Sequence, residues 1–284
     1  KDLSITRTAV SWGIPFPYDS KHTTYVWFDA LNYYLTALDY PNKKYQEFWP
    51  ADLQMMAKEI LWFHAVIFPA MLMSAGIKPA KKVFAHGWLT VDGKKMSKSV
   101  GNVVDPVEMV KKYGSDAFRY YLMRDIPFGQ DGDFSEKRMV ERINNELVNE
   151  LGNLSSRTLS LVEKYKGELK GKGVLTLDFK TLDKKMQHLE LHHVLDDVFS
   201  YIKKVNKYIH EHTPWEKKDK ELGDILYNLV EALRFISILI YPFMPTTSLE
   251  LCNQLGVFLG NFNDLSFKAW KGNIKKGKHL FSRI

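Results

Sequence analysis

The stretch HGWLTVDGKKMSKSVGNVVDP, residues 86–106, combines positive charge with a flexible backbone. Lys95 and Lys98 lie three positions apart in it, and Gly93 and Gly101 flank them closely. Glycine adopts positive φ readily, so such a loop can move and close over a ligand. Two ammonium groups delivered in this way would stabilise the charge that develops as a phosphoryl bond breaks. The Walker pattern G-x-x-x-x-G-K-[ST] is absent, and a solvated surface loop is the plain alternative.

The composition is ordinary for a soluble globular protein. Of the 284 residues, 45% are hydrophobic and 26% are charged, and the net charge of +7 permits a polyanionic partner without requiring one. Cys252 is the single cysteine, which excludes an internal disulfide and a zinc site built from several cysteines, and we interpret it as a small core residue. The low cysteine content fits a reducing, cytoplasmic setting. No apolar run reaches the roughly 18 residues of a membrane span, so we expect no membrane partner.

The first part of the chain alternates strand-like and helical segments. Residues 25–38 begin with a short β-prone run and continue with helical spacing. Leu53–Met56 and residues 82–89 are typical of strands, and residues 59–75 predict a helix that ends at Gly76, a good helix-terminating residue. This alternation of strand and helix indicates a parallel α/β sheet.

From about residue 135 the pattern becomes helical throughout. Ser135 is a suitable N-cap, and Pro242 stops the last of three apolar series. We therefore expect an all-helical bundle joined to the α/β part. The three series are Ile143, Leu147, Leu151, Leu154; Leu191, Val194, Leu195, Val198, Ile202, Val205, Ile209; and Leu222, Ile225, Leu226, Leu229, Leu233, Ile236, Ile240.

The segment KMSKS at 95–99 resembles the second signature of class I aminoacyl-tRNA synthetases, a mobile loop that contacts ATP. Further segments occur in the order found in the methionyl-tRNA synthetases, and the similarity covers essentially the whole chain and is greatest to the bacterial type. These segments are YVWFDALNYYLTAL (25–38), KEILWFHAVIFPAML (58–72), FAHGWLTVDGKKMSKSVGNVVDP (84–106), DAFRYYLMRDIPFGQDGDFS (116–135), NELGNLSSRT (149–158) and LFSRI (280–284).

The resemblance implies a fold in three parts. Residues 1–80 would be the C-terminal half of a Rossmann catalytic domain, so the α/β part would be a partial Rossmann fold. Residues 81–134 would carry the KMSKS loop and the region that contacts the tRNA stem. Residues 135–284 would form an all-α anticodon-binding helical bundle.

The resemblance also implies two substrate sites in the α/β part. A methionine pocket would be lined by Trp27, Ala30, Leu31, Tyr34, Ile60 and His64. An aromatic and aliphatic wall suits a thioether, although core packing is the ordinary explanation of such residues. ATP would be bound by Glu59, His86, Gly87, Leu89, Lys95 and Lys98, with the two lysines catalytic. Ala57 departs from the family, which usually has glycine two residues before the acid, and this weakens the assignment of Glu59 to the ribose.

In the helical part, Asn153, Arg157 and Trp215 match the family's anticodon readers. Asn153 and Arg157 are four residues apart, so on one helix they point the same way. An indole at Trp215 would stack on an unpaired base, which is how proteins commonly read single-stranded RNA. The alternative from the residues alone is a surface cation and a core tryptophan.

The family's first signature, His-Ile-Gly-His, occurs nowhere, and from its first residues we expect the chain to start partway through a domain. We therefore expect the C-terminal portion of the enzyme, whether a split subunit or a fragment, with a separate N-terminal half chain as a possible partner. The other expected partners are methionine, ATP with Mg²⁺, and tRNA(Met); we expect no zinc site. A class I synthetase for leucine or valine, and a non-catalytic tRNA-binding or assembly subunit, remain the alternatives.

Overall fold

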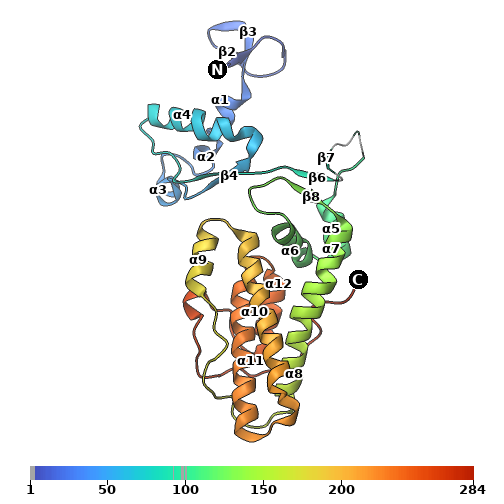
Figure 1. Ribbon diagram of the computed structural model, residues 1–284. Coiled ribbons are helices and arrows are strands. Elements are labelled where there is room, and N and C mark those ends of the chain that lie inside the picture. The colour runs from blue at the N-terminus through green and yellow to red at the C-terminus, as the bar shows by residue number, and fades with distance from the viewer. Residues whose placement is uncertain (1–3, 92, 97–98, 100) are drawn as a thin grey trace. The chain divides into compact units, whose positions relative to one another are not determined.

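The structure, a computed structural model, describes residues 4–91, 93–96, 99 and 101–284. It divides into two compact units, Lys1–Trp88 and Leu89–Ile284 (Figure 1). The elements of the first unit are β1 (Thr6–Arg7), β2 (Pro15–Phe16), β3 (Asp19–Thr24), α1 (Val26–Ala30), α2 (Tyr33–Thr36), α3 (Lys43–Phe48), β4 (Gln54–Ala57), η1 (Lys58–Ile60), η2 (Phe63–Ile67), α4 (Phe68–Ser74) and β5 (Val83–His86).

The first unit contains two small sheets. The antiparallel sheet has the order β1-β3-β2, and β4 and β5 form a parallel pair in which Gln54 lies beside Val83 and Ala57 beside His86. The strands predicted around Leu53–Met56 and in residues 82–89 are thereby confirmed, as is their parallel direction. The small core of this unit comes from helices α1, α2 and α4 and from Trp49, whose indole N–H donates to the carbonyl of Lys78 at 2.7 Å.

The β-prone start predicted for residues 25–38 is wrong. Tyr25 is extended, but α1 begins at Val26, so Val26, Trp27 and Phe28 are helical. Preference for strand is weak for such residues and depends on their packing. Here helical geometry sends Leu31 into the core, where it is 1% exposed.

The helix predicted over residues 59–75 exists, but its turns are not uniform. It starts with the tight turn η1, widens to the π-helical turn η2 and becomes regular in α4, and Gly76 follows at φ +70°. Pro69 lies in the first turn of α4 and has no N–H to donate to the preceding turn. A wide turn directly before it accommodates the proline without breaking the helix.

The second unit joins a small sheet to long helices. Its sheet has the order β7-β6-β8, with β6 and β7 antiparallel and β6 and β8 parallel. Its elements are β6 (Leu89–Val91), β7 (Lys94–Lys95), α5 (Pro106–Tyr113), α6 (Ser115–Asp125), β8 (Gly132–Phe134), α7 (Glu136–Arg142), η3 (Ile143–Gly152), α8 (Asn153–Lys164), α9 (Phe179–Gln187), α10 (Leu191–His212), η4 (Pro214–Glu216), α11 (Asp219–Ile240), α12 (Pro245–Leu255) and η5 (Phe262–Asp264).

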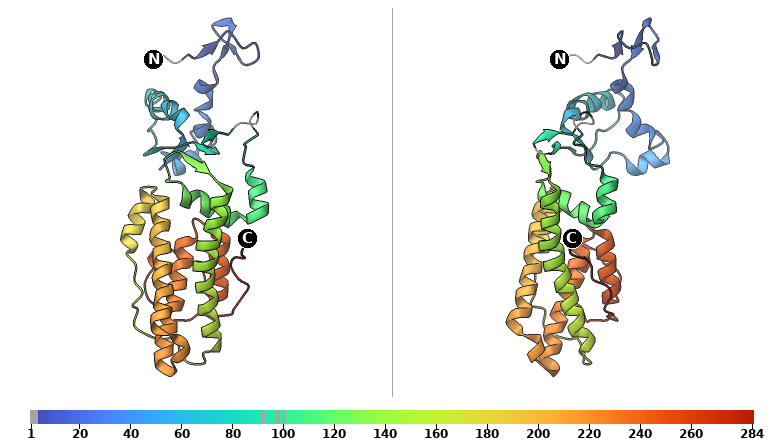
Figure 2. Two further views of the ribbon diagram at one scale, coloured as in Figure 1. Left: turned by 45° about the vertical axis from the view of Figure 1, so that its right-hand side comes forward. Right: turned by 90° about the vertical axis from the view of Figure 1, so that its right-hand side faces the viewer.

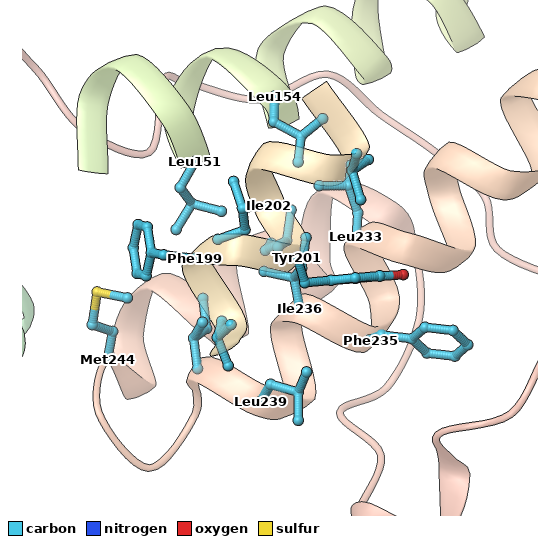
Figure 3. Packing of buried hydrophobic residues seen from close by; sticks show 14 of the residues in the cluster. Leu151, Leu154, Phe199, Tyr201, Ile202, Leu233, Phe235, Ile236, Leu239 and Met244 are labelled. Carbon is cyan, nitrogen blue, oxygen red and sulfur yellow. The ribbon is translucent and has the colours of Figure 1, made fainter. Parts of the chain in front are cut away.

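Helix α11 lies at the centre of the helical part. Every residue from Gly223 to Ile240 except Asp224 is buried. Helices α8, α10 and α12 pack around α11 (Figure 2). Side chains from η3, α8, α10, α11 and Met244 meet in one hydrophobic cluster, as Figure 3 shows. The predicted helices over 191–209 and 222–240 are confirmed, and Cys252 is a buried core residue as expected.

The first predicted helical series begins as an α-helix, as expected, and then continues as a wider π-helix. The Ser135 side chain accepts from the Arg138 N–H at 3.3 Å, which confirms it as the N-cap of α7. Residues Ile143–Gly152 then form a π-helix, η3. The spacing of Ile143, Leu147 and Leu151 is four residues, which exceeds the 3.6-residue turn of an α-helix. Wider turns keep all three on one buried face, where none is more than 3% exposed.

Polar anchors connect α6 to the long helices. The Asp116 carboxylate accepts from the N–H of Thr247 at 2.6 Å, so it caps the first turn of α12 from a distant part of the chain. At the other end of α6, Arg124 forms ion pairs with Glu146 of η3 and Asp196 of α10. These contacts fix α6 against three helices.

A buried ion pair ties α11 to the segment that follows α12. Arg234 donates to both carboxylate oxygens of Glu231, at 2.9 and 2.7 Å, and also to the carbonyls of Asp264 and Ser266. Glu231 is 1% exposed and Arg234 is 9% exposed. Removing one member of such a pair leaves the other charge buried and unpaired, which is far more costly than the pair itself.

We therefore expect Glu231→Ala to lower the free energy of unfolding by about 3–5 kcal/mol. Glu221→Ala is the matched control on the same helix, because Glu221 pairs with Lys217 at the surface and its side chain is 63% exposed. The control should lose less than about 1 kcal/mol. Urea unfolding followed by circular dichroism measures both, and equal losses would contradict a structural role for the buried pair.

Candidate functional site

The six side chains that the family resemblance assigns to methionine line one hollow in the first unit, together with other residues. The hollow has a volume of about 630 Å³. Its walls come from α1 and the residue after it, from α2, and from the η1 and η2 turns. The six residues are Trp27, Ala30, Leu31, Tyr34, Ile60 and His64.

Aromatic rings form one wall of this hollow. The indole of Trp27 stacks on Phe63, with ring centroids 4.3 Å apart and planes 13° apart. The His64 ring lies nearly perpendicular to Trp27, at 6.4 Å and 81°. Offset stacked and edge-on pairs are both favourable arrangements of aromatic rings, so the wall holds a defined shape. Phe63 is a residue that the sequence reasoning missed.

Hydrogen bonds hold His64 in one tautomer. Its Nδ1 lies 2.9 Å from the carbonyl oxygen of Ile60, which can only accept, so Nδ1 carries the proton. Its Nε2 lies 3.0 Å from the Tyr34 hydroxyl, which therefore donates to it in the neutral ring. Burial raises the pKa of Tyr34, which keeps this hydroxyl protonated at neutral pH. Both ring nitrogens of a side chain that is only 3% exposed are thus satisfied within the protein.

The residues assigned to ATP in the first unit lie where the parallel strands end. Ala57 and His86 are paired as the last residues of β4 and β5, Glu59 follows β4 within the η1 turn, and Gly87 follows β5 directly. The carboxyl ends of parallel strands are the usual ligand-binding edge of an open α/β sheet. Leu89 opens β6 in the second unit.

The loop that carries Lys95 and Lys98, here called the lysine loop, begins at the end of the β6–β7 hairpin of the second unit. Lys95 ends β7 and is paired with Thr90, and the Asn102 side chain donates to the Lys95 carbonyl at 3.2 Å. Gly93 and Gly101 have φ of +69° and +73°, a region that glycine occupies without strain. Lys98 lies outside the described residues.

Asp133 of β8 fixes this hairpin. One carboxylate oxygen accepts from the Gly93 N–H and from the Thr90 hydroxyl, each at 2.8 Å. The hydrogen bond from the Gly93 N–H is the main cause of a lowered pKa at Asp133, followed by that from Thr90. Neither Asp133 nor Asn102 was identified from the sequence; for Asp133 the reason is that a strand forty residues away gives no local signal.

The three residues assigned to the anticodon lie on exposed parts of the helical region. Asn153 and Arg157 occupy successive turns of α8, and Arg157 lies 3.3 Å from His210 of α10, measured from Nη1 to Nε2. Trp215 belongs to the short turn η4 and is 56% exposed, so it is not the core residue of the alternative interpretation. His210 is another residue that the sequence reasoning missed.

Comparison with known proteins shows which family has these features. The family model described as tRNA synthetases class I (M) matches residues 1–159. The chain belongs to this family. Similar curated proteins include the methionine–tRNA ligases of Caldanaerobacter subterraneus subsp. tengcongensis, 44% identical, and Clostridium tetani, 46% identical, each over the whole of this chain and 48% of the relative. The chain thus spans about half the length of the curated relatives it matches.

Solved structures of class I synthetases agree. Mycobacterium tuberculosis methionyl-tRNA synthetase in complex with methionyl-adenylate matches with a TM-score of 0.87 and 36% identity, over 100% of this chain and 60% of that one. The family resemblance inferred from the sequence is confirmed, and it is to synthetases for methionine rather than for leucine or valine. Within the described residues, no helix is long and apolar enough to cross a membrane, and no group of three or more His, Cys, Asp or Glu side chains is placed to hold a metal.

The hydrogen bond between Tyr34 and His64 should contribute to the stability of the first unit. Tyr34→Phe leaves the buried Nε2 of His64 without a donor, so we expect a loss of about 1–3 kcal/mol in the free energy of unfolding. Tyr33→Phe is the matched control, because Tyr33 is the adjacent residue and is 69% exposed. Equal urea midpoints for the two variants would show that the hydroxyl does not hold His64.

Proposed function

We propose that this chain forms part of a methionine–tRNA ligase. Such an enzyme joins methionine to ATP, giving methionyl-adenylate and pyrophosphate, and then transfers the methionyl group to the terminal adenosine of tRNA(Met). The observation that carries the proposal is the single hollow lined by all six residues assigned to methionine, in a chain whose family is that of the methionine enzymes.

The hollow suits an uncharged thioether side chain. Contacts between sulfur and aromatic rings contribute about 0.3–1.5 kcal/mol each, and Trp27 and Tyr34 supply such rings. Both ring nitrogens of His64 are engaged within the protein, by the Ile60 carbonyl and the Tyr34 hydroxyl. The other lining residues, Asp29, Asn32, Tyr33 and Thr36, carry polar groups, so the aromatic and aliphatic part of the wall is the part proposed to hold the thioether.

The strand ends and the lysine loop provide the proposed ATP site. Glu59, His86 and Gly87 would contact the nucleoside at the end of β4 and β5, with Leu89 beside the adenine. The methionine carboxylate attacks the α-phosphate and the bond to pyrophosphate breaks, so the protein supplies alignment and charge rather than a nucleophile. Lys95 and Lys98 would stabilise the leaving pyrophosphate, and Mg²⁺ would enter bound to the phosphates of ATP.

The helical part is the proposed tRNA-binding region. Residues 135–284 would form the anticodon-binding domain, residues 81–134 the loop and stem-contact region, and residues 1–80 part of the catalytic domain. The amide of Asn153 and the guanidinium of Arg157 would reach the edges of unpaired bases, and the exposed indole of Trp215 would stack on one.

The proposal includes a segment with the His-Ile-Gly-His signature, which this sequence does not contain, and in the test it is supplied as a separate polypeptide. ATP–pyrophosphate exchange tests this. The chain alone should bind tRNA(Met) and exchange poorly, and addition of that polypeptide should give methionine-dependent exchange. Strong exchange by the chain alone would refute the need for a partner. Tight tRNA binding with no exchange under either condition would favour a non-catalytic tRNA-binding subunit.

Lys98→Ala should reduce adenylate formation selectively. Loss of one well-placed charge on the pyrophosphate slows the step by about a hundredfold or more. Binding of an RNA anticodon stem-loop should stay unchanged, because the loop lies outside the helical part. Exchange and fluorescence anisotropy measure the two quantities, and a parallel loss of both would indicate that the lysine contacts RNA phosphates.

Trp215→Ala should give the opposite result. Loss of one stacked base weakens binding of the stem-loop by about 1–3 kcal/mol, while methionine-dependent exchange is retained. The control is Phe258→Ala, because Phe258 is an exposed aromatic residue. Trp270 is unsuitable, because its indole N–H donates a hydrogen bond to the Gly272 carbonyl. An unchanged dissociation constant for Trp215→Ala would remove this residue from the RNA site.

A further inference from the structure

We propose that His210 is a positioning residue that orients Arg157 for reading an RNA base. The inference rests on the proposed function of the helical part as an anticodon-binding region. It assigns a role to a residue of α10 that faces α8, 53 positions away along the chain.

The direction of the hydrogen bond follows from chemistry. A guanidinium has only donors, so Arg157 Nη1 donates to His210 Nε2 across 3.3 Å. Nε2 must then be unprotonated, and in the neutral ring the proton is on Nδ1. The contact therefore depends on one tautomer of His210.

The two helices that carry this pair are firmly placed. Leu154 and Thr158, on either side of Arg157 in the sequence of α8, are fully buried, and so is Ile209 beside His210 on α10. The pair itself lies at the surface, where His210 is exposed and Arg157 partly exposed. A long side chain that is free in solution loses rotamer freedom when it binds, and an acceptor that restrains it beforehand reduces that loss.

His210 also precedes the turn that carries Trp215. Thr213 ends α10 in the left-handed region, at φ 40° and ψ 60°, and its hydroxyl donates to Glu216 at 3.1 Å. A β-branched residue rarely adopts this conformation, and such strained residues are concentrated at functional sites. His210 thus lies on α10 three residues before the strained turn that leads to the proposed stacking residue.

His212 provides an internal comparison. Its Nδ1 lies 3.0 Å from the carbonyl of Tyr208, and its ring lies 3.9 Å from the Tyr208 ring, both within α10. It is exposed like His210 and only two residues away, but its contacts are with its own helix. Its removal changes the local charge and aromatic content in the same way without touching Arg157.

The test uses a synthetic RNA anticodon stem-loop with CAU in the loop, and a set in which each loop base is replaced in turn. Dissociation constants are measured by fluorescence anisotropy for the full chain and for His210→Ala, His210→Gln, Arg157→Ala, the Arg157→Ala/His210→Ala double variant and the control His212→Ala. Circular dichroism checks that each variant is folded.

We expect His210→Ala to weaken binding about three- to tenfold, because the hydrogen bond is long and exposed to solvent, and to reduce discrimination at the same loop base as Arg157→Ala. His210→Gln should retain discrimination, because its amide oxygen also accepts. The double variant should bind like Arg157→Ala alone. His212→Ala should bind like the unaltered chain.

Three results would overturn the inference. If Arg157→Ala weakens binding and His210→Ala does not, His210 has no role while the anticodon assignment stands. If the two losses multiply in the double variant, His210 acts on the RNA independently of Arg157. If Arg157→Ala itself binds normally, the anticodon assignment of Arg157 fails, and the role of His210 fails with it.

Discussion

The burial of α11 is the constraint on which the larger unit depends. A helix that is apolar on nearly every side must be surrounded, and α8, α10 and α12 meet this requirement. The same requirement fixes the ends of the neighbouring helices. α10 reverses into α11 through Thr213 and η4, so the exposed Trp215 lies where two buried helices join. The proposed RNA-binding residues are therefore positioned by packing that they do not themselves provide.

The long helices could be predicted from the sequence because burial alone determines them. Residues such as Val194, Val198 and Ile202 repeat at helical spacing, and the corresponding helix is present. The width of the helical turns and the conformation of short segments could not be predicted from hydrophobic spacing. The four-residue spacing of Ile143, Leu147 and Leu151 was interpreted as an ordinary helix, although wider turns fit it better. The strand preference of Val26–Phe28 was overridden because Leu31 had to reach the core.

Some contacts of the candidate sites could be predicted from the family resemblance, and others could not. Trp27 and His64 are 37 positions apart, and only the family resemblance predicts that they meet, because their spacing alone favours core packing. The contacts of Asp133 with Gly93 and of His210 with Arg157 join different elements and leave no periodic trace. Neither the residues nor the resemblance therefore predicted them. Such cross-element hydrogen bonds depend on tertiary packing, which local patterns do not encode.

Buried and exposed polar groups have opposite roles in this chain. His64 and the Glu231–Arg234 pair are buried, and their hydrogen bonds are made within the protein, so they define shape and present little to a ligand. Asn153, Arg157 and Trp215 keep polar or aromatic surface outside, where base edges and faces can reach it. The aromatic and aliphatic part of the pocket is thus proposed to receive an uncharged side chain, while the helical surface is proposed to offer exposed polar and aromatic groups to RNA. An uncharged thioether and an unpaired RNA loop are the ligands proposed for these two arrangements, because the first is bound by burial and the second by exposed base-reading groups.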